Sequence, residues 1–582
     1  MKAEQKTLTG FISNNESYEI PFFQRSYVWD TEQWQRLLDD VIFASSSKKP
    51  FFLGAMIFKE KQDENGIIEG NIVIDGQQRL TTLFIFYKVL CLLTGQSMWF
   101  NSTFTKISDN KPILTQSHSN INDFNYILSL NTPEDIEVNE NSSQIKKAYK
   151  FFLDNLREII LIKQNKDESN RLIIDFPNLY RLMNFVVISL GNKEDEQQIF
   201  DTINSLGVKL TTGELLKNYL FNNVNISDYT EIWKPVFEKD QETLKFWDSQ
   251  ITTGRLNKKT IDVFLYYFLQ IKTQDKDING DKKLYRRWEN LFASFKTLVE
   301  LNHIDKEVLA IEITDYAKIF MDCFNREDND EVPSTFGIER ISFIINNLDS
   351  TTLIPYVLYI INEVNDEDER NKIFGFLETY IIRRLITNAN NNNYSDLFTE
   401  NLIGQGVKTF DTLVKYLLSK DPSVSVSIPS NEAVAYGFKN TQFKNNNRAL
   451  GILYLLESLT RSDVHSTRLL SFDGYQLEHL MPKKWKQHWE LLADVTESER
   501  DGKILTLGNL AMITGGLNKS IRNYDWKTKI NGKNNKPGLK SFANGINTID
   551  PYLSLDKWSE REIENRANEL AELANQKWCI PS

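Results

Sequence analysis

Cysteine is scarce in this sequence, and long apolar runs are absent. The 582 residues include three cysteines, Cys91, Cys323 and Cys579, and no two of them form a CxxC pair. This spacing excludes a disulfide framework and a cysteine-type structural zinc site, and it favours a reducing compartment. We therefore expect a cytoplasmic protein.

No segment of the sequence resembles a targeting or membrane-spanning signal. Residues 1–10 are polar and lack the apolar core of a signal peptide. The most apolar stretch, residues 80–93, is too short to cross a bilayer and contains Lys88. We expect a buried helix there and no membrane partner.

The composition is that of a globular protein with several domains. Hydrophobic residues make up 41% and charged residues 25% of the chain, and the net charge is −11. At roughly 100–200 residues per domain, the length indicates about three domains. The pattern of strand-like and helical segments divides the chain into a mixed region (1–225), a helical linker region (226–425) and a third region (426–582). A Pro/Ser stretch at 421–430 marks the second boundary. The predicted fold class is α+β, multidomain.

Apolar spacing predicts the main elements. Residues 51–59 and 72–74 read as strands, and residues 80–93 read as a helix. Residues 101–145 are rich in Asn, Ser and Thr, and we expect an irregular excursion there. Further helices are expected at 260–271, 352–364, 372–386, 450–459 and 558–573.

The sequence YQLEHLMP, residues 475–482, contains candidate catalytic and metal-binding residues. Glu478 and His479 are neighbours, so on a strand they face opposite sides, and one can bind a metal while the other faces substrate. Asn509 follows thirty residues later, and Asn518 nine residues after it. A helix carrying Asn518 could pack behind a hairpin carrying His479, an arrangement in which His acts as general base on water and a metal neutralises phosphate charge.

Basic residues gather in the same part of the chain. Residues 503–540 hold eight Lys or Arg against one acid, Asp525. In an acidic chain, such a cluster is typical of a phosphate-binding surface, although a solvated basic face gives the same pattern. Its predicted phosphate contacts are Lys519, Arg522 and Lys527.

Two N-terminal motifs point to a second site. They are IPFFQRSYVW (20–29) and VIDGQQRLTTL (73–83), and the second reads as a strand, an Asp-Gly turn and a helix. A helix N-terminus after Gly offers N–H groups to an anion, Arg79 can grip a phosphate, and Asp75 can hold Mg²⁺. Gln77 or Gln78 could position water. No GxxxxGK[ST] is present, so this is not a P-loop site.

The C-terminal set resembles the HNH endonuclease superfamily. The resemblance implies a ββα-metal nuclease within a mostly helical domain, with His479 as general base and Glu478 and Asn518 as metal ligands. It assigns Asn509 to the catalytic set as the residue that braces the loop holding the histidine. The chain has Asn518 where many members have His. The implied cofactor is a divalent metal, Mg²⁺ first and Mn²⁺ second.

The N-terminal motifs resemble GmrSD-type, modification-dependent (type IV) restriction endonucleases. A third match is FDTINSLGVKLTTGELLKNYL (200–220), and the Arg383–Arg384 pair resembles the one that precedes the family's nuclease. The resemblance implies a ParB/sulfiredoxin-like N-terminal domain that binds and hydrolyses NTP through Asp75, Gly76, Gln77, Gln78 and Arg79. It also implies a DNA- or nucleotide-sensing set: Phe23, Gln24, Arg25, Tyr27, Trp29, Asn204 and Lys217. As an alternative, the aromatic residues Phe22, Phe23, Tyr27 and Trp29 belong to the core or to an interface.

The resulting hypothesis is an anti-phage defence endonuclease whose NTPase domain regulates cutting of foreign double-stranded DNA. The resemblance implies that modified phage DNA, through modified cytosine or phosphorothioate, is the cue, and that GTP, ATP, UTP or CTP is the effector. One HNH domain per chain fits nicking or cutting as a homodimer. The alternatives are a ParB-like NTP-dependent DNA-binding regulator with little or no nuclease activity, and an unregulated toxin-like nuclease, which would need no DGQQR centre.

Overall fold

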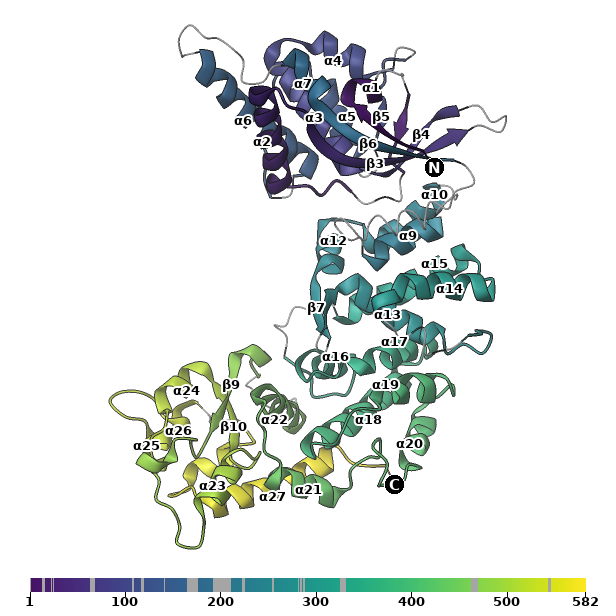
Figure 1. The fold of residues 1–582 in the computed structure, drawn as a ribbon. Helices are drawn as coiled ribbons and strands as arrows, with labels where there is room; N and C mark the ends of the chain where they lie inside the picture. Colours follow the sequence, from purple (N-terminus) through teal and green to yellow (C-terminus); the bar gives the residue numbers. More distant parts are fainter. Residues whose placement is uncertain are drawn as a thin grey trace. The chain divides into compact units, whose positions relative to one another are not determined.

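A computed structural model gives the fold (Figure 1). It describes residues 2–581 with these exceptions: 13–15, 22–23, 25, 63–67, 107–108, 117–119, 141, 165–175, 192–210, 222–225, 254–255, 281, 283–284, 286–287, 325–330, 462–468 and 543–545. The architecture is mixed α/β, multidomain and mostly helical, with a small mixed sheet near the N-terminus. Contacts divide the chain into two units, Met1–Leu244 and Lys245–Ser582.

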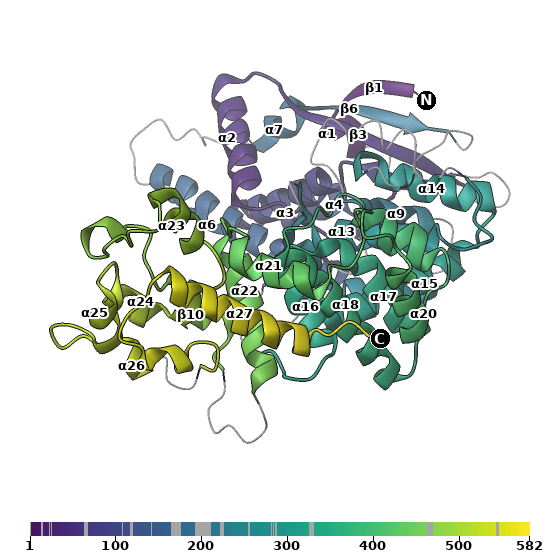
Figure 2. The same cartoon turned by 90° about the horizontal axis from the view of Figure 1, so that it is seen from below.

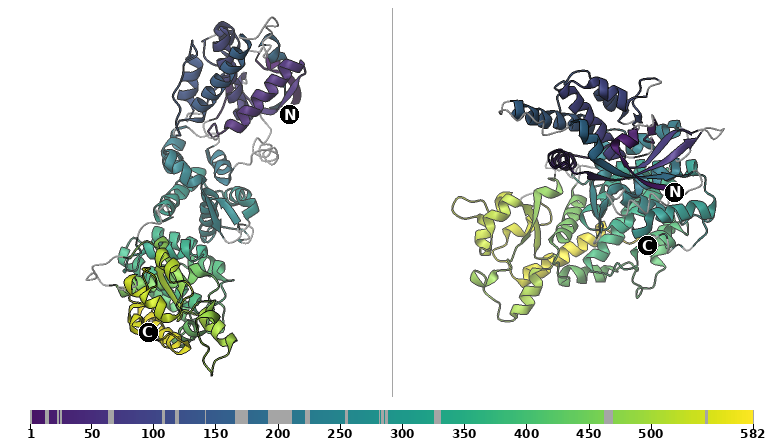
Figure 3. Two further views of the ribbon diagram at one scale, coloured as in Figure 1. Left: turned by 90° about the vertical axis from the view of Figure 1, so that its left-hand side faces the viewer. Right: turned by 45° about the horizontal axis from the view of Figure 1, so that its top comes forward.

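The first unit is built on a sheet that has six strands within the described residues. Their order is β1 (Lys2–Thr7), β6 (Met183–Leu190), β3 (Phe51–Gln62), β4 (Ile68–Asp75), β2 (Tyr18–Glu19) and β5 (Leu114–Thr115). The β3–β6, β4–β2 and β2–β5 pairs are parallel, whereas β1–β6 and β3–β4 are antiparallel. The right view of Figure 3 shows β1, β3 and β6, in purple and blue, side by side.

Helix α3 (Gln77–Thr94) forms the centre of this unit. Its residues are buried almost all round, because the sheet lies on one side and α4 (Ser97–Phe104), α5 (Ile121–Ser129) and α6 (Gln144–Gln164) pack on the others. The main core also takes in α1 (Leu8–Ile12), α2 (Thr31–Ser47) and α7 (Phe176–Leu182). The apolar stretch at 80–93 was predicted to be a buried helix because it is too short to cross a bilayer, and α3 confirms this prediction.

The excursion expected at 101–145 is wrong in part. Helix α5 lies within it and buries Phe124 and Ile127 completely. With Leu128, these residues fall on one face of a helix, and the surrounding Asn and Ser residues hid that spacing in the composition.

The first unit ends in short helices. These are α9 (Thr212–Phe221), α10 (Ile226–Asp228), the π-helix η1 (Tyr229–Trp233), α11 (Lys234–Phe237) and the first part of α12 (Gln241–Asp248). Trp233 stacks on Phe237, with ring centroids 4.2 Å apart. This aromatic contact ties η1 to α11.

The second unit begins with a hairpin and a layer of helices. These elements are β7 (Gln250–Thr253), β8 (Leu256–Lys259), α13 (Thr260–Lys272), η3 (Trp288–Asn290), α14 (Leu291–Asn302), α15 (Lys306–Phe324), α16 (Ile338–Asn347), η4 (Thr351–Leu353), α17 (Ile354–Glu363), α18 (Glu367–Ile386), α19 (Tyr394–Asp396), η5 (Leu397–Ile403) and α20 (Phe410–Leu418). The helices predicted at 260–271, 352–364 and 372–386 are present as α13, α17 and α18, with small shifts at their ends.

The rest of the unit surrounds a two-stranded sheet. It consists of α21 (Asn431–Asn440), α22 (Asn446–Thr460), η6 (Phe472–Gly474), β9 (Tyr475–His479), η7 (Trp485–Gln487), α23 (Glu497–Ile504), β10 (Leu510–Thr514), α24 (Gly515–Ile521), α25 (Trp526–Asn531), α26 (Leu539–Phe542), η8 (Asp550–Ser554) and α27 (Glu560–Lys577). Helix α27 packs along α21 and α22, as Figure 2 shows.

Buried arginines join the middle helices to this C-terminal part. Arg340 pairs bidentately with Glu378 through contacts of 2.7 and 2.6 Å, and Glu378 also accepts from the Trp578 indole at 2.8 Å. The predicted Arg383–Arg384 pair is buried on α18. Arg383 donates to the carbonyls of Pro429 and Trp578, and Arg384 donates to the carbonyls of Ser425 and Ser427. The Pro/Ser stretch is thus fastened to α18.

Candidate functional site

Strands β9 and β10 place the predicted nuclease residues around one hairpin. The strands are antiparallel, with His479 opposite Leu510 and Glu478 opposite Ala511. Helix α24 follows β10 directly and contacts both strands, with Asn518 on it. A Cβ on Gly515 would lie 3.0 Å from the Gln476 side chain, so the missing side chain lets the helix start close against β9.

His479 ends β9 with its imidazole partly buried. Its Nε2 atom is buried and has no hydrogen-bond partner among the described residues. Burial first, and then the charges of Lys483 and Lys529, lower the pKa of His479 to about 4. The imidazole is therefore neutral at pH 7, which leaves one ring nitrogen able to accept a proton.

Asn509 fixes the loop that follows His479. Its side chain is fully buried, accepts from Met481 N at 2.8 Å and donates to Met481 O at 2.9 Å. Its own carbonyl accepts from Leu480 N at 3.0 Å, and the Trp558 indole donates to its Oδ1 at 3.0 Å. These contacts set the path of residues 480–481, which is a bracing role and not a chemical one.

Helix α27 supports Asn509 from behind. The fully buried Arg566 donates to the carbonyls of Leu507, Gly508 and Leu510 at 2.7–3.1 Å. A Cβ on Gly508 would lie 2.3 Å from the Ile563 carbonyl oxygen, so this position must be glycine if α27 is to approach. Sequence reasoning missed Arg566, because nothing near it in the sequence signals its partners.

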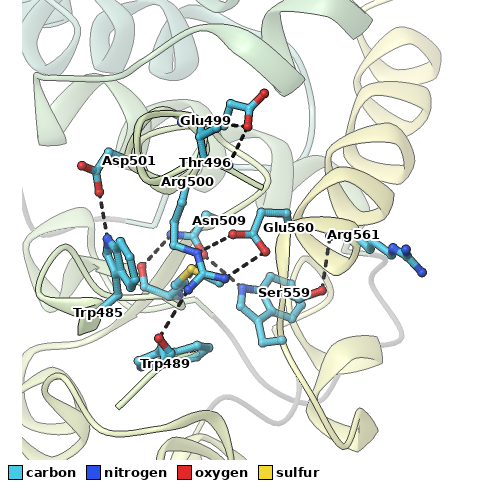
Figure 4. A network of polar contacts seen from close by, with 12 residues as sticks. Trp485, Trp489, Thr496, Glu499, Arg500, Asp501, Asn509, Ser559, Glu560 and Arg561 are labelled. Carbon is cyan, nitrogen blue, oxygen red and sulfur yellow. Dashed lines mark hydrogen bonds and ion pairs between the residues drawn. The ribbon is translucent and has the colours of Figure 1, made fainter. Parts of the chain in front are cut away.

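A second network missed from the sequence lies beside this loop (Figure 4). Arg500 pairs with Glu560 in the interior and lies 4.7 Å from the centre of the Trp485 ring. Asp501 accepts from the Trp485 indole at 2.8 Å. The network ties the 480s loop to α23 and α27, and the one local signal was the Thr496–Glu499 capping box that starts α23.

Glu478 faces away from solvent and is paired with a lysine. It is 7% exposed, and the Lys529 ammonium, which is fully buried, donates to its carboxylate and to the His479 carbonyl at 2.8 Å. Burial raises the pKa of Glu478 and lowers the pKa of Lys529. Lys529 is one of the eight basic residues at 503–540, but its charge is neutralised inside the protein, so it does not belong to an exposed basic face.

Asn518 is partly exposed, and its amide donates weakly to Gln476 Oε1 and Leu477 O, both at 3.4 Å. A divalent ion needs oxygen ligands that are free to bind it. Glu478 is already bonded to Lys529, and no three His, Cys, Asp or Glu side chains gather as a metal site anywhere in the described ranges. The predicted ligand pair, Glu478 and Asn518, therefore does not fit the ion in this arrangement.

Of the seven other basic residues at 503–540, Lys503 is half-buried and pairs with Glu564 at 3.9 Å, and the remaining six form an exposed set. We call it the basic surface, and its members form no ion pair with any described residue: Lys519, Arg522, Lys527, Lys533, Lys536 and Lys540. They lie on α24, α25, α26 and the connections between them. The predicted phosphate contacts Lys519, Arg522 and Lys527 are all in this surface.

The N-terminal motif forms the predicted strand, turn and helix. β4 ends at Asp75, Gly76 turns the chain with φ of 102°, and α3 starts at Gln77. A Cβ on Gly76 would lie 2.9 Å from the Met56 side chain. Arg79 donates to Asp75 at 3.1 Å and to the Ala55 carbonyl, while its Nε is buried without a partner among the described residues.

Two predicted sensing residues and Gln78 hold this turn in place instead of facing solvent. Gln78 accepts from Val28 N at 2.9 Å and donates to Ser26 O at 3.1 Å. Gln24 donates to the carbonyl of Val73 at 2.5 Å. The buried Tyr27 hydroxyl lies 2.6 Å from Thr82 and accepts from the Trp34 indole at 2.7 Å. Trp29 is partly exposed.

The other sensing residues lie elsewhere or outside the described residues. Lys217 is buried on α9, where it pairs with Glu238 at 2.6 Å and lies 5.8 Å from the centre of the Tyr229 ring. Its charge is therefore neutralised in the interior. Phe23, Arg25 and Asn204 fall outside the residues that the structure describes.

Comparison with known families covers both ends of the chain. The model of the GmrSD restriction endonuclease N-terminal domain matches residues 8–221, and the model of the GmrSD restriction endonuclease C-terminal domain matches residues 428–573. A search of curated proteins finds no match. In the described part of the chain, no helix combines the length and apolar character needed to cross a membrane. With matches to both of its domains in the expected order, the chain belongs to the GmrSD restriction endonuclease family.

Proposed function

We propose that this chain is a defence enzyme in which His479 is the general base for cutting or nicking foreign double-stranded DNA. Family membership implies a DNA endonuclease, and the HNH chemistry is our own assignment. The observation that carries it is the buried Nε2 of His479, which has no partner among the described residues, beside a loop fixed by Asn509. The neutral imidazole takes a proton from water, the water oxygen bonds to phosphorus, and the bond from phosphorus to the leaving oxygen breaks, after which that oxygen takes a proton from solvent.

The basic surface supplies the binding side of this proposal. Lys519 and Arg522 lie at the end of α24, and Lys527 lies on α25, all exposed. Their charges attract phosphates and make DNA affinity depend on salt. Dependence on Mg²⁺ or Mn²⁺ stays a prediction, checked by chelating the metal with EDTA and adding each ion back.

His479→Gln tests the nuclease assignment. We expect DNA cleavage to fall by about 10³-fold or more, since the general base is lost, while NTP hydrolysis continues. The matched control is His488→Gln, an exposed histidine nine residues on, which should keep cleavage. Cleavage by His479→Gln at the wild-type rate would rule the assignment out.

For the N-terminal end, we propose that the turn at Gly76 and the start of α3 bind the phosphates of an NTP, with Arg79 as their cation. The supporting features are the 18-residue helix, whose first N–H groups favour an anion, and the guanidinium beside them. Arg79→Ala should lower NTP hydrolysis by about 10²-fold, whereas Arg36→Ala, an exposed arginine on α2, should not. An unchanged rate in Arg79→Ala would leave Arg79 with a structural role.

We also propose that DNA modification and a bound nucleotide regulate cleavage by this chain. The decisive experiment compares unmodified, glucosylated-hydroxymethylated and phosphorothioated plasmids with GTP, ATP, UTP or CTP. If only one of these plasmids is cut, and if one nucleotide changes the rate of cutting, the experiment identifies both the DNA modification and the nucleotide that regulate the enzyme. NTP hydrolysis without any cutting would favour a DNA-binding regulator, although the match to the family's C-terminal domain does not favour it. The same plasmids distinguish nicked from linear products, and sedimentation at working concentration measures whether the chain forms a homodimer.

A further inference from the structure

The pair between Glu478 and Lys529 is unusual because both groups are almost wholly removed from water. Glu478 is 7% exposed, and Lys529 is 0% exposed. The ammonium has three N–H donors, and it uses one on the Glu478 carboxylate and another on the His479 carbonyl at 2.8 Å. One lysine therefore contacts two consecutive residues, and the second is the proposed base.

Lys529 reaches this position from a helix that is itself fixed. Helix α25 is capped by Asp525, which accepts from Thr528 N at 3.0 Å, and its Trp526 stacks on Trp558 with ring centroids 5.0 Å apart. The Trp526 indole donates to Leu555 O at 2.8 Å. Trp558 also contacts Asn509, so α25 and the loop after His479 share one support.

We infer that Lys529 is a positioning residue for His479, and that Glu478 is its buried counterion instead of a metal ligand. This inference rests on the proposed role of His479. The hydrogen bond from Lys529 holds the carbonyl of His479, which fixes the backbone from which the imidazole projects. Glu478 supplies the negative charge without which the ammonium could not be buried. A divalent ion would have to displace that ammonium from a carboxylate that solvent hardly reaches.

The first test measures metal binding independently of activity. Mn²⁺ titrations followed by electron paramagnetic resonance on the full chain compare wild type, Glu478→Gln and Lys529→Met. We expect the same Mn²⁺ stoichiometry and affinity in all three. If Glu478 is a ligand, Glu478→Gln loses a bound ion or about tenfold or more in affinity, and Lys529→Met, which frees the carboxylate, does not; that result overturns the inference.

The second test follows the imidazole directly. The chain has five histidines, so nuclear magnetic resonance spectra of protein with carbon-13-labelled histidine contain few resonances. The resonance that disappears in His479→Gln is assigned to His479. Lys529→Met should shift that resonance and lower kcat by about tenfold or more with KM unchanged, because the base is misplaced while DNA still binds. Lys272→Met, which removes a lysine paired with Glu312 on the middle helices, is the control and should change neither.

The double variant Glu478→Gln/Lys529→Met distinguishes positioning from folding. Removing both charges should restore much of the melting temperature lost in either single variant, since no unpaired charge remains buried. Its kcat should stay low, because the bond to the His479 carbonyl is still missing. Full recovery of kcat, or an unmoved His479 resonance in Lys529→Met, would overturn the inference. A different result would contradict the proposed function itself: His479→Gln would then cut DNA at the wild-type rate.

Discussion

At the scale of single residues, the nuclease end depends on ionisable groups held in the interior. Burial and two lysines lower the pKa of His479 from 6.5 to about 4. Such a histidine is a weak base, but it is almost fully deprotonated at pH 7, so every molecule is ready to accept a proton.

The same shift predicts how stability changes with pH. An unfolded chain binds a proton at His479 near pH 6.5 and the folded chain only near pH 4, so acid favours unfolding within that window. Between pH 7 and 5 this site should cost about 2 kcal/mol of stability. Calorimetric melting of wild type and His479→Gln over this range measures it, and the wild type should lose more. Parallel losses in the two proteins would mean that the pKa is not lowered.

Some of these residues could be predicted from the sequence and others could not. Asp75, Gly76 and Arg79 lie within five positions of one another, so local rules were enough to place them on a strand end, a turn and a helix. The partner of Glu478 is 51 residues away, and that of Arg500 is 60 residues away. No local pattern encodes such contacts, because they depend on how helices pack in three dimensions.

At the scale of elements, the hairpin and α27 form one assembly. Helix α27 contacts the segment before β10 so closely that its Ile563 carbonyl would lie 2.3 Å from a Cβ on Gly508, and its Arg566 donates to three carbonyls there. The helix at 558–573 was predicted from its apolar spacing, but not its contact with the hairpin. Nearby residues in the sequence are enough to predict this helix, but its packing on the hairpin depends on residues far away in the sequence.

Gly508→Ala tests this docking. The added methyl group meets backbone atoms that cannot rotate away, so we expect a loss of about 3 kcal/mol in stability. Because α27 must move off the loop that Asn509 braces, cleavage should fall as well. Melting temperature and cleavage rate are the measurements, with Gly516→Ala as control, since a Cβ there meets no atom within 4 Å. Equal stability of the two variants would show that α27 is not held at this distance.

At the scale of the whole molecule, most of the region predicted as a linker, from Lys245 on, shares one packed unit, Lys245–Ser582, with the region predicted as a nuclease. Arg340 and Glu378 from the middle helices contact Ser458 and Trp578 from the C-terminal part. The boundaries predicted near residues 225 and 425 were drawn from changes in the sequence pattern, and such changes do not show which surfaces pack together.

This packing predicts how fragments behave. A fragment of residues 428–582 leaves out α16 and α18, which exposes apolar surface on α21 and α22 and removes the partner of the Trp578 indole. We expect it to lack a cooperative melting transition, whereas residues 241–582, which keep α12 whole, should melt cooperatively. Near-ultraviolet circular dichroism against temperature measures both, and a sharp transition in the shorter fragment would contradict the prediction.

The contact between Glu378 and Trp578 also has a consequence for synthesis on the ribosome. The two residues are 200 positions apart, so at translation rates of about 5–20 residues per second the carboxylate waits roughly 10–40 s for its indole. In the first part of that interval Arg340 also lacks Ser458, which is made 118 positions after it. The middle helices therefore complete their core only after the proposed catalytic residues have been translated.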